Sequence, residues 1–162
     1  MLFNPLMKLG LAGLLLVCGA TFAMSDDKNY AYQLQLKNCG GYYLNAIKLQ
    51  KKKSGSSSWS TVQDFGFQEK DMTNGHSWCI DISSYGFKSG DQARLKAYID
   101  SGNTVNCDGT NYGGTSDQKS RRSMKMAGTT LNNNDCRTKS YAYPLSSKCS
   151  SNGTRKYEGA CS

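Results

Sequence analysis

Large apolar residues alternate with small or polar ones over several short segments of the chain. Residues 30–37 follow this period of two, and residues 43–50 partly repeat it after a turn at 39–41. A period of two is typical of a strand that buries one face. The sequence therefore predicts two strands here, and their closeness along the chain predicts that they are neighbours in a sheet.

The same pattern predicts further strands at 59–67, 76–82, 93–99, 104–107 and 122–131, and a weaker one at 140–145. In the run at 93–99 a helical period would place Arg94 or Lys96 on the buried stripe, so a strand fits better. The turn that follows predicts a hairpin with the next strand. Seven to eight short strands separated by turn residues indicate an all-β fold, an antiparallel β-sandwich.

The first 23 residues have the features of an export signal. Lys8 is followed by an apolar run at 9–20 and by small residues at Thr21 and Ala23, which predicts cleavage after Ala23. The run is shorter than the ~20 residues of a membrane-spanning helix. We therefore expect a secreted or periplasmic protein without a transmembrane segment, and the short signal favours a bacterial source. Lipid attachment at Cys18 is the alternative, which the bulky Val17 before it disfavours.

The remainder, residues 24–162, is expected to form one domain with a thin apolar core. Leu, Ile, Val and Phe make up 16 of its 139 residues, and so low a share in a charged chain calls for another source of stability. An even number of cysteines in an exported chain predicts three disulfides. The six cysteines are Cys39, Cys79, Cys107, Cys136, Cys149 and Cys161, and the sequence leaves their pairing open.

The C-terminal segment 131–162 is poor in large apolar groups yet contains three of these cysteines. We expect a loop-rich tail that is held by disulfides more than by burial. The cysteines are too widely spaced for a zinc site, and the glycine-rich loop at 108–117 lacks the spacing of a calcium loop. No metal and no cofactor are expected.

His76 is the only histidine of the sequence, which restricts the candidate enzymes. A small extracellular hydrolase would have to combine His76 with Glu69 or Asp71 and a basic residue. No nucleophile motif accompanies it, so a histidine at a strand end is the favoured interpretation and no catalytic residue is assigned. A protein inhibitor or interaction module with a disulfide-held loop is a third alternative.

Basic residues give the strongest indication of function. From Met24 on, 19 Lys and Arg face 12 Asp and Glu, a formal charge of +7. Such a potential attracts anionic partners, although solubility alone would also explain it. The basic residues form three groups along the chain, namely Lys48, Lys51, Lys52 and Lys53, then Lys119, Arg121, Arg122 and Lys125, and last Lys148, Arg155 and Lys156.

We therefore predict a secreted, non-catalytic binding or effector protein that recognises an anionic or glycan-bearing surface. The surface would be a phospholipid headgroup, an acidic polysaccharide or a host glycan, and aromatic rings would add short-range contacts. Nucleic acid is a weaker candidate because the sequence has no aromatic RNA-binding motif, and a host protein as partner stays open. The predicted binding residues are Lys48, Lys51, Lys52, Lys53, Arg121, Arg122, Lys125, Tyr42, Tyr43 and Trp59.

Overall fold

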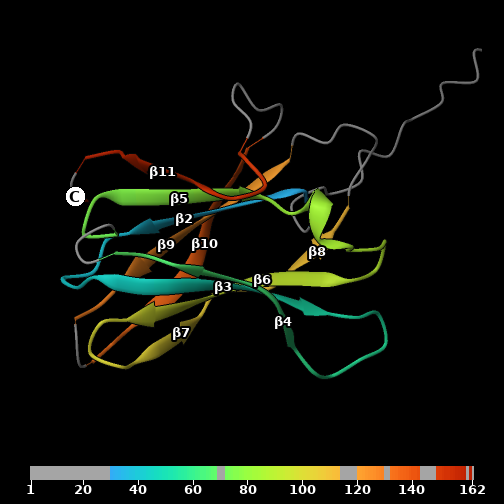
Figure 1. Cartoon of the computed structure of the whole chain (residues 1–162), viewed down its shortest axis with the longest axis horizontal. Helices are drawn as coiled ribbons and strands as arrows, with labels where there is room; N and C mark the ends of the chain where they lie inside the picture. The colour runs from blue at the N-terminus through green and yellow to red at the C-terminus, as the bar shows by residue number, and fades with distance from the viewer. Residues whose placement is uncertain are drawn as a thin grey trace, which may run out of the picture.

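Two β-sheets face each other in the computed structural model, which describes residues 30–68, 72–113, 120–129, 132–142, 149–159 and 161 (Figure 1). The strands are β1 (Tyr30–Ala31), β2 (Gln33–Asn38), β3 (Leu44–Lys52), β4 (Ser60–Gly66), β5 (His76–Asp81), β6 (Gln92–Ile99), β7 (Thr104–Asn106), β8 (Thr110–Tyr112), β9 (Arg121–Ala127), β10 (Asp135–Ala142) and β11 (Thr154–Tyr157), with a short 3-10 helix, η2, at Ser83–Tyr85. Sheet A has the order β1-β8-β6-β3-β4, with β7 also paired to β6, and sheet B has the order β10-β9-β2-β5-β11. The predicted disulfide-linked all-β sandwich is confirmed.

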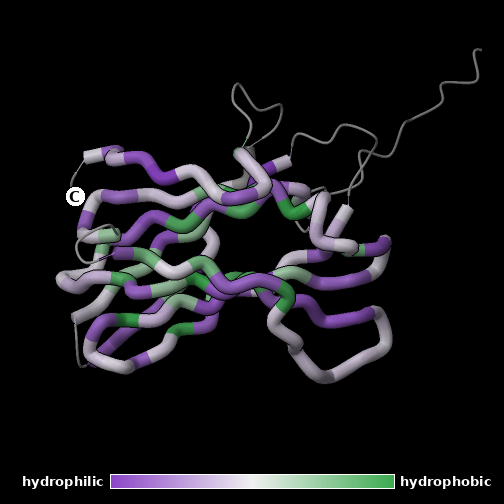
Figure 2. The backbone as a smooth tube through the Cα atoms, in the orientation of Figure 1, coloured by the Kyte–Doolittle hydropathy of each residue, from purple (hydrophilic) through white to green (hydrophobic). Residues whose placement is uncertain are grey.

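The core lies between the sheets, where β6 and β9 bury every second residue and β5 buries four residues in succession. In β6 the residues Ala93, Leu95, Ala97 and Ile99 are at most 1% exposed, and their neighbours along the strand are half-buried on the other side. The strands of sheet B contribute aliphatic and methionine side chains to the same cluster. Figure 2 shows hydrophobic and hydrophilic positions alternating along the strands of both layers. The outward positions of each strand are therefore left to polar and charged side chains.

Strand pairing differs from the sequence prediction in three respects. The described part of the chain contains 11 strands, because the strand predicted at 30–37 is divided into β1 and β2, β8 lies in the segment predicted as a loop, and β11 lies in the predicted tail. Two pairs, β1 with β8 and β2 with β9, are parallel, so both sheets are mixed. The prediction that the first two long strands are neighbours is wrong: β2 pairs with β5 and β9 in sheet B, whereas β3 pairs with β4 and β6 in sheet A. The hairpin of β6 with β7 is confirmed.

All six predicted cysteines form disulfides. Cys107, which follows β7, is bonded to Cys136 of β10 and so joins the two sheets. The other two, Cys79–Cys149 and Cys39–Cys161, tie the segments before and after β11 to the body of sheet B. Three disulfides indicate an oxidising compartment, extracellular or periplasmic. The predicted export signal and Cys18 lie outside the described residues, and within those residues no helix has the length and apolarity of a membrane span.

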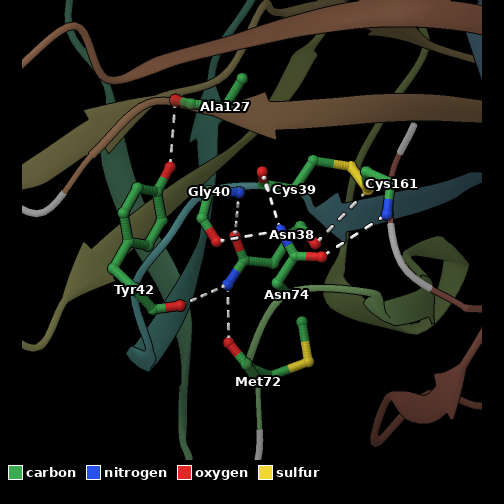
Figure 3. Close-up of a disulfide and its surroundings, with 8 residues drawn as sticks. All are labelled: Asn38, Cys39, Gly40, Tyr42, Met72, Asn74, Ala127 and Cys161. Atoms are coloured by element: carbon green, nitrogen blue, oxygen red, sulfur yellow. Dashed lines mark hydrogen bonds between the residues drawn. A yellow bond between two sulfur atoms is a disulfide. The ribbon is translucent and has the colours of Figure 1, made fainter.

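Polar contacts surround the Cys39–Cys161 disulfide (Figure 3). The buried Asn38 amide donates hydrogen bonds to the Tyr42 carbonyl at 2.9 Å and the Met72 carbonyl at 2.7 Å. The Asn74 amide donates to the Cys39 carbonyl at 3.1 Å, and its oxygen accepts from the Cys161 backbone at 3.5 Å. The C-terminal end of the described chain is thus fixed to the connection between the two sheets by a disulfide and by hydrogen bonds.

We expect the Cys39→Ser/Cys161→Ser variant to release β11 locally. Cleavage by trypsin after Arg155 or Lys156 should accelerate about tenfold, because this bridge anchors the chain beyond β11 and no residue of that strand is buried. The Cys107→Ser/Cys136→Ser variant serves as control. It should lower the free energy of unfolding of the whole domain by about 3 kcal/mol without singling out β11. Equal cleavage patterns in the two variants would contradict the conclusion that the Cys39–Cys161 disulfide anchors β11.

Candidate anion-binding surface

The outer face of sheet A carries a group of basic and aromatic side chains from β3, β6 and the loop before β4. Register pairs lie side by side on this face, Lys48 opposite Lys96 and Gln50 opposite Arg94. Because the intervening residues of both strands point into the core, these side chains face outward. We call this group the sheet A surface; its members are Lys48, Lys52, Trp59, Arg94, Lys96 and Tyr98.

Trp59 is contacted by two of the cations of this surface. The Arg94 guanidinium lies 4.3 Å and the Lys52 ammonium 5.3 Å from the centre of the ring system. Arg94 also donates a hydrogen bond to the Gln50 side chain at 2.8 Å, and partial burial lowers the pKa of the guanidinium. Gly109 lies against the ring, since a Cβ there would come within 3.2 Å of it. Trp59 therefore has a defined place, with a positive charge fixed over it.

Tyr98 is the second aromatic centre of the sheet A surface. The ammonium groups of Lys48 and Lys96 lie 4.7 and 5.3 Å from the centre of its ring. Lys48 also forms an ion pair of 3.1 Å with Asp64, and this hydrogen bond is the main cause of a raised pKa of Lys48. Asp64 is exposed and Lys48 is partly exposed, so solvent screens the pair and it adds little to stability. The four cations lie together on one face, and Asp64 is the carboxylate paired with them.

The residues of the first predicted basic group do not all lie on this surface. Lys48, Lys52 and Trp59 belong to the sheet A surface, with Lys52 over the Trp59 ring and Lys48 over Tyr98, and Lys53 is exposed in the adjoining loop. Lys51 points toward the segment after η2, where its ammonium donates to the Gly86 carbonyl at 3.1 Å and lies 5.2 Å from the centre of the Phe87 ring. The sandwich geometry thus separates Lys51 from its sequence neighbours.

The second basic group lies on the opposite side of the molecule. Arg121 and Lys125 alternate with buried residues of β9 and face outward from sheet B, where Lys156 of the third group also lies. The basic groups therefore do not converge on one face. Lys119 and Lys148 lie outside the described residues. Tyr43, 38% exposed, lies before β3, and its carbonyl accepts a hydrogen bond from Asp100.

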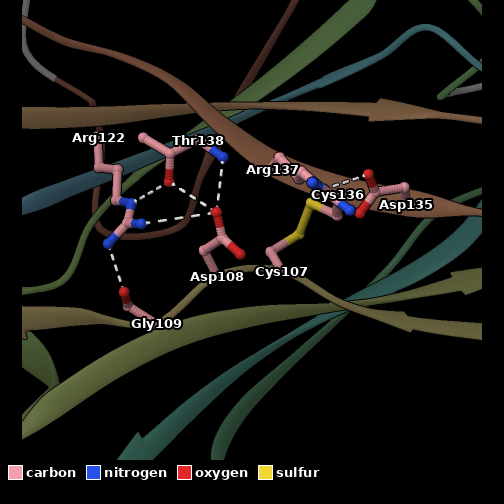
Figure 4. A network of polar contacts seen from close by, with 8 residues as sticks. All are labelled: Cys107, Asp108, Gly109, Arg122, Asp135, Cys136, Arg137 and Thr138. Atoms are coloured by element: carbon pink, nitrogen blue, oxygen red, sulfur yellow. Dashed lines mark hydrogen bonds and ion pairs between the residues drawn. A yellow bond between two sulfur atoms is a disulfide. The ribbon is translucent and has the colours of Figure 1, made fainter.

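Arg122 points between the sheets and is buried, which corrects its prediction as a ligand contact (Figure 4). Its guanidinium donates to the Thr138 hydroxyl at 2.6 Å and to the Gly109 carbonyl, and lies 3.8 Å from the Asp108 carboxylate. The same carboxylate accepts from the Thr138 backbone at 2.9 Å. Arg122 therefore bonds to the same glycine that lies against the Trp59 ring.

Tyr42 is likewise buried, which removes it from the predicted ring contacts. Its side chain is 4% exposed and its hydroxyl donates to the Ala127 carbonyl at 3.1 Å. The ring lies over Gly40, where a Cβ would come within 2.1 Å of it. Tyr42 therefore closes the core beside the β2 to β3 connection and cannot reach a ligand.

His76 has two described contacts. Its Nδ1 lies 3.0 Å from the Thr73 hydroxyl, and its ring centre lies 5.1 Å from that of Tyr157. Neither contact supplies the carboxylate or the cation that a hydrolytic site would need, and Glu69 and Asp71 lie outside the described residues. Among the residues that the structure describes, no group of three or more metal-ligating side chains occurs.

Sequence reasoning missed half of the sheet A surface, namely Arg94, Lys96 and Tyr98. The alternation at 93–99 already placed these three on the polar side of one strand. The pattern does not give the register between β3 and β6, which places these residues beside Lys48 and Lys52. That register depends on pairing between segments more than 40 residues apart, as in the pair Lys48 and Lys96.

Comparison with known proteins identifies no family. No protein-family model and no curated protein sequence matches the chain. Among solved structures, pneumolysin and a non-hemolytic pneumolysin from Streptococcus pneumoniae are distantly similar, with 14% identity, TM-scores of 0.35 and 0.36, and coverage of 66% of this chain. The match spans 23% of the length of those chains. A similarity of this level transfers no function, so the interpretation depends on the residues themselves.

We expect Tyr42 to lower the stability of the fold at alkaline pH. Burial raises the pKa of its phenol to about 12, whereas the unfolded chain has a value of about 10. The unfolded state therefore loses this proton first, and stability should fall as the pH rises from about 10 to about 12. In Tyr42→Phe this fall should be smaller, with a remainder from Tyr85 and Tyr112, whose pKa values burial also raises. Denaturant unfolding at several pH values measures the free energy of unfolding. The prediction would be contradicted if this free energy fell as much between pH 10 and 12 in Tyr42→Phe as in the unchanged protein.

Proposed function

We propose that this protein is a non-catalytic binding protein that attaches to an anionic phospholipid surface through the sheet A surface. The observation that carries the proposal is the gathering of four cations around two aromatic rings on one broad face. Each Lys or Arg near an anionic membrane contributes about 1 kcal/mol of attraction. Trp and Tyr have apolar rings with a polar end, and such side chains suit the headgroup region.

The positions of the cations favour an anionic ligand over a neutral glycan. A neutral sugar binds aromatic residues by lying on the ring, and cations already lie over Trp59 and Tyr98 at 4.3 to 5.3 Å. The rings therefore hold the charged groups in place, and the donors of those groups are directed to partners such as phosphate. Two of the four cations have two partners each: Arg94 is held by Gln50 and Trp59, and Lys48 by Asp64 and Tyr98.

The test uses Lys52→Gln/Lys96→Gln, since the described contacts of these two lysines are with rings alone. Binding to phosphatidylcholine vesicles that contain phosphatidylserine, measured by sedimentation, should weaken about 30-fold, as two charges at about 1 kcal/mol each imply. Binding of the unchanged protein should also weaken as salt is added. Vesicles without phosphatidylserine should bind neither protein.

Lys88→Gln/Arg155→Gln is the matched control because it removes the same charge from exposed residues outside the sheet A surface. It should weaken vesicle binding no more than about threefold, through the net charge alone. Equal losses in the two variants would contradict the proposal. So would binding that is insensitive to salt, or binding to heparin or a host glycan in place of vesicles.

A further inference from the structure

The outer face of sheet B has a groove made of two adjoining pockets of about 260 and 310 Å³. Gln35 and Glu158 line both pockets and so form their common border. Arg121 and Lys156 line the first pocket. The second is lined by three lysines, Lys37, Lys125 and Lys139. We call the two pockets together the sheet B groove.

The strand register brings these cations together. Lys37 and Lys125 are partners in the parallel pairing of β2 with β9, and both lie beside buried residues that point into the core. Lys139 lies at the bulge of β10, next to β9. Arg121 is held at the other end, where its guanidinium donates to the side chains of Gln33 and Gln35. The cations therefore belong to four strands of one sheet and not to a mobile loop.

Glu158 is the one carboxylate among the described residues that line the groove. Its Oε1 accepts a hydrogen bond from the Gln35 amide at 3.0 Å, and its backbone donates to the Gly75 carbonyl at 2.9 Å. The charge of Glu158 reaches Arg121, whose pKa it raises against the larger lowering by burial. An acidic group of the chain itself is thus held at the meeting point of the two pockets, within a ring of cations.

We propose that the sheet B groove binds an acidic oligosaccharide, and that Glu158 occupies the place of one of its anionic groups in the free protein. The lysines and Arg121 would pair with sulfate or carboxylate groups. The hydroxyls of Ser123 and Thr154, which line the pockets, donate to Gln35 and Ser150, and their oxygens would accept hydrogen bonds from sugar hydroxyls. This site is separate from the sheet A surface and does not depend on it.

The shape and lining of the groove favour a saccharide chain over a membrane. Two adjoining pockets with charges at both ends suit a linear ligand with repeated anionic groups. The sheet A surface places Trp59 and Tyr98 among its cations, as suits the headgroup region of a membrane, whereas no aromatic side chain lines either pocket of the groove. Most of the residues that line the groove are polar or charged.

The test measures binding of a fluorescent short heparin oligosaccharide to the purified protein by polarisation. Lys125→Gln/Lys139→Gln should lose about tenfold in affinity, because both lysines line the three-lysine pocket. Glu158→Gln keeps an oxygen that can accept from Gln35 and removes only the charge, so affinity should rise about threefold. The gain on removing an acid is the result that distinguishes a competing internal group from a merely structural one.

Two charge-matched variants complete the experiment. Asp100→Asn adds the same charge as Glu158→Gln at an exposed turn and should leave affinity within about 1.5-fold. Lys88→Gln/Arg155→Gln removes the same charge as the lysine variant, outside the groove. Affinity changes in these variants as large as in the groove variants would overturn the proposal, and so would an equal loss in Lys52→Gln/Lys96→Gln. Groove variants that weaken vesicle binding but not oligosaccharide binding would replace the saccharide with a lipid.

Discussion

The burial of one side of every central strand is the constraint on which the charged faces of this protein depend. Because β6 fills the core with alternate residues from Ala93 to Ile99, its remaining side chains have no place but the outer face. The pairing of β3 with β6 then sets Lys48 opposite Lys96, a like-charge pair that is unfavourable by itself. The Tyr98 ring lies within reach of both ammonium groups and offsets part of this repulsion.

The disulfides and the Arg122 network let a thin core support this distribution of charge. Cys107–Cys136 and the contacts of Arg122 cross from one sheet to the other within a few residues of each other. A buried guanidinium is tolerated because the Asp108 carboxylate and neutral oxygens satisfy it. The same network holds Gly109 against Trp59. The closure of the sandwich and the placement of the Trp59 ring therefore share one set of contacts.

The sequence was sufficient to locate strands whose alternation is local, and insufficient to pair them. Most of the long strands lie close to the predicted ranges, since apolar and polar positions alternate in the sequence, but β10 begins at Asp135, five residues before the predicted range 140–145. The partners of β2 are β5 and β9, which are remote in sequence, and no local pattern encodes them. The four residues of β11 are all exposed, so the strand carries no apolar signal.

In the candidate site, too, the sequence predicted local features but not those that depend on packing between the sheets. Lys48, Lys52 and Trp59 were predicted from composition along a short segment, and their contacts are local or lie on one neighbouring strand. Tyr42 and Arg122 were misplaced because a basic or aromatic residue beside a turn or strand can face either way. The direction of the side chain is decided by packing against the other sheet, as the contact of Arg122 with the loop at Gly109 shows. The residue types were therefore known from the sequence, but not the direction in which each side chain points.

The two proposed binding regions face opposite directions, and this has a physical consequence. Sheets in a sandwich lie about 10 Å apart, before their outward side chains are counted, which exceeds the Debye length of about 8 Å at physiological salt. Neutralising Lys52 and Lys96 at one face therefore leaves the field at Lys125 and Lys139 nearly unchanged. A flat membrane can contact one broad face of the sandwich at a time, so occupation of the sheet A surface leaves the sheet B groove open. The two proposed sites would therefore be filled with little electrostatic competition between them.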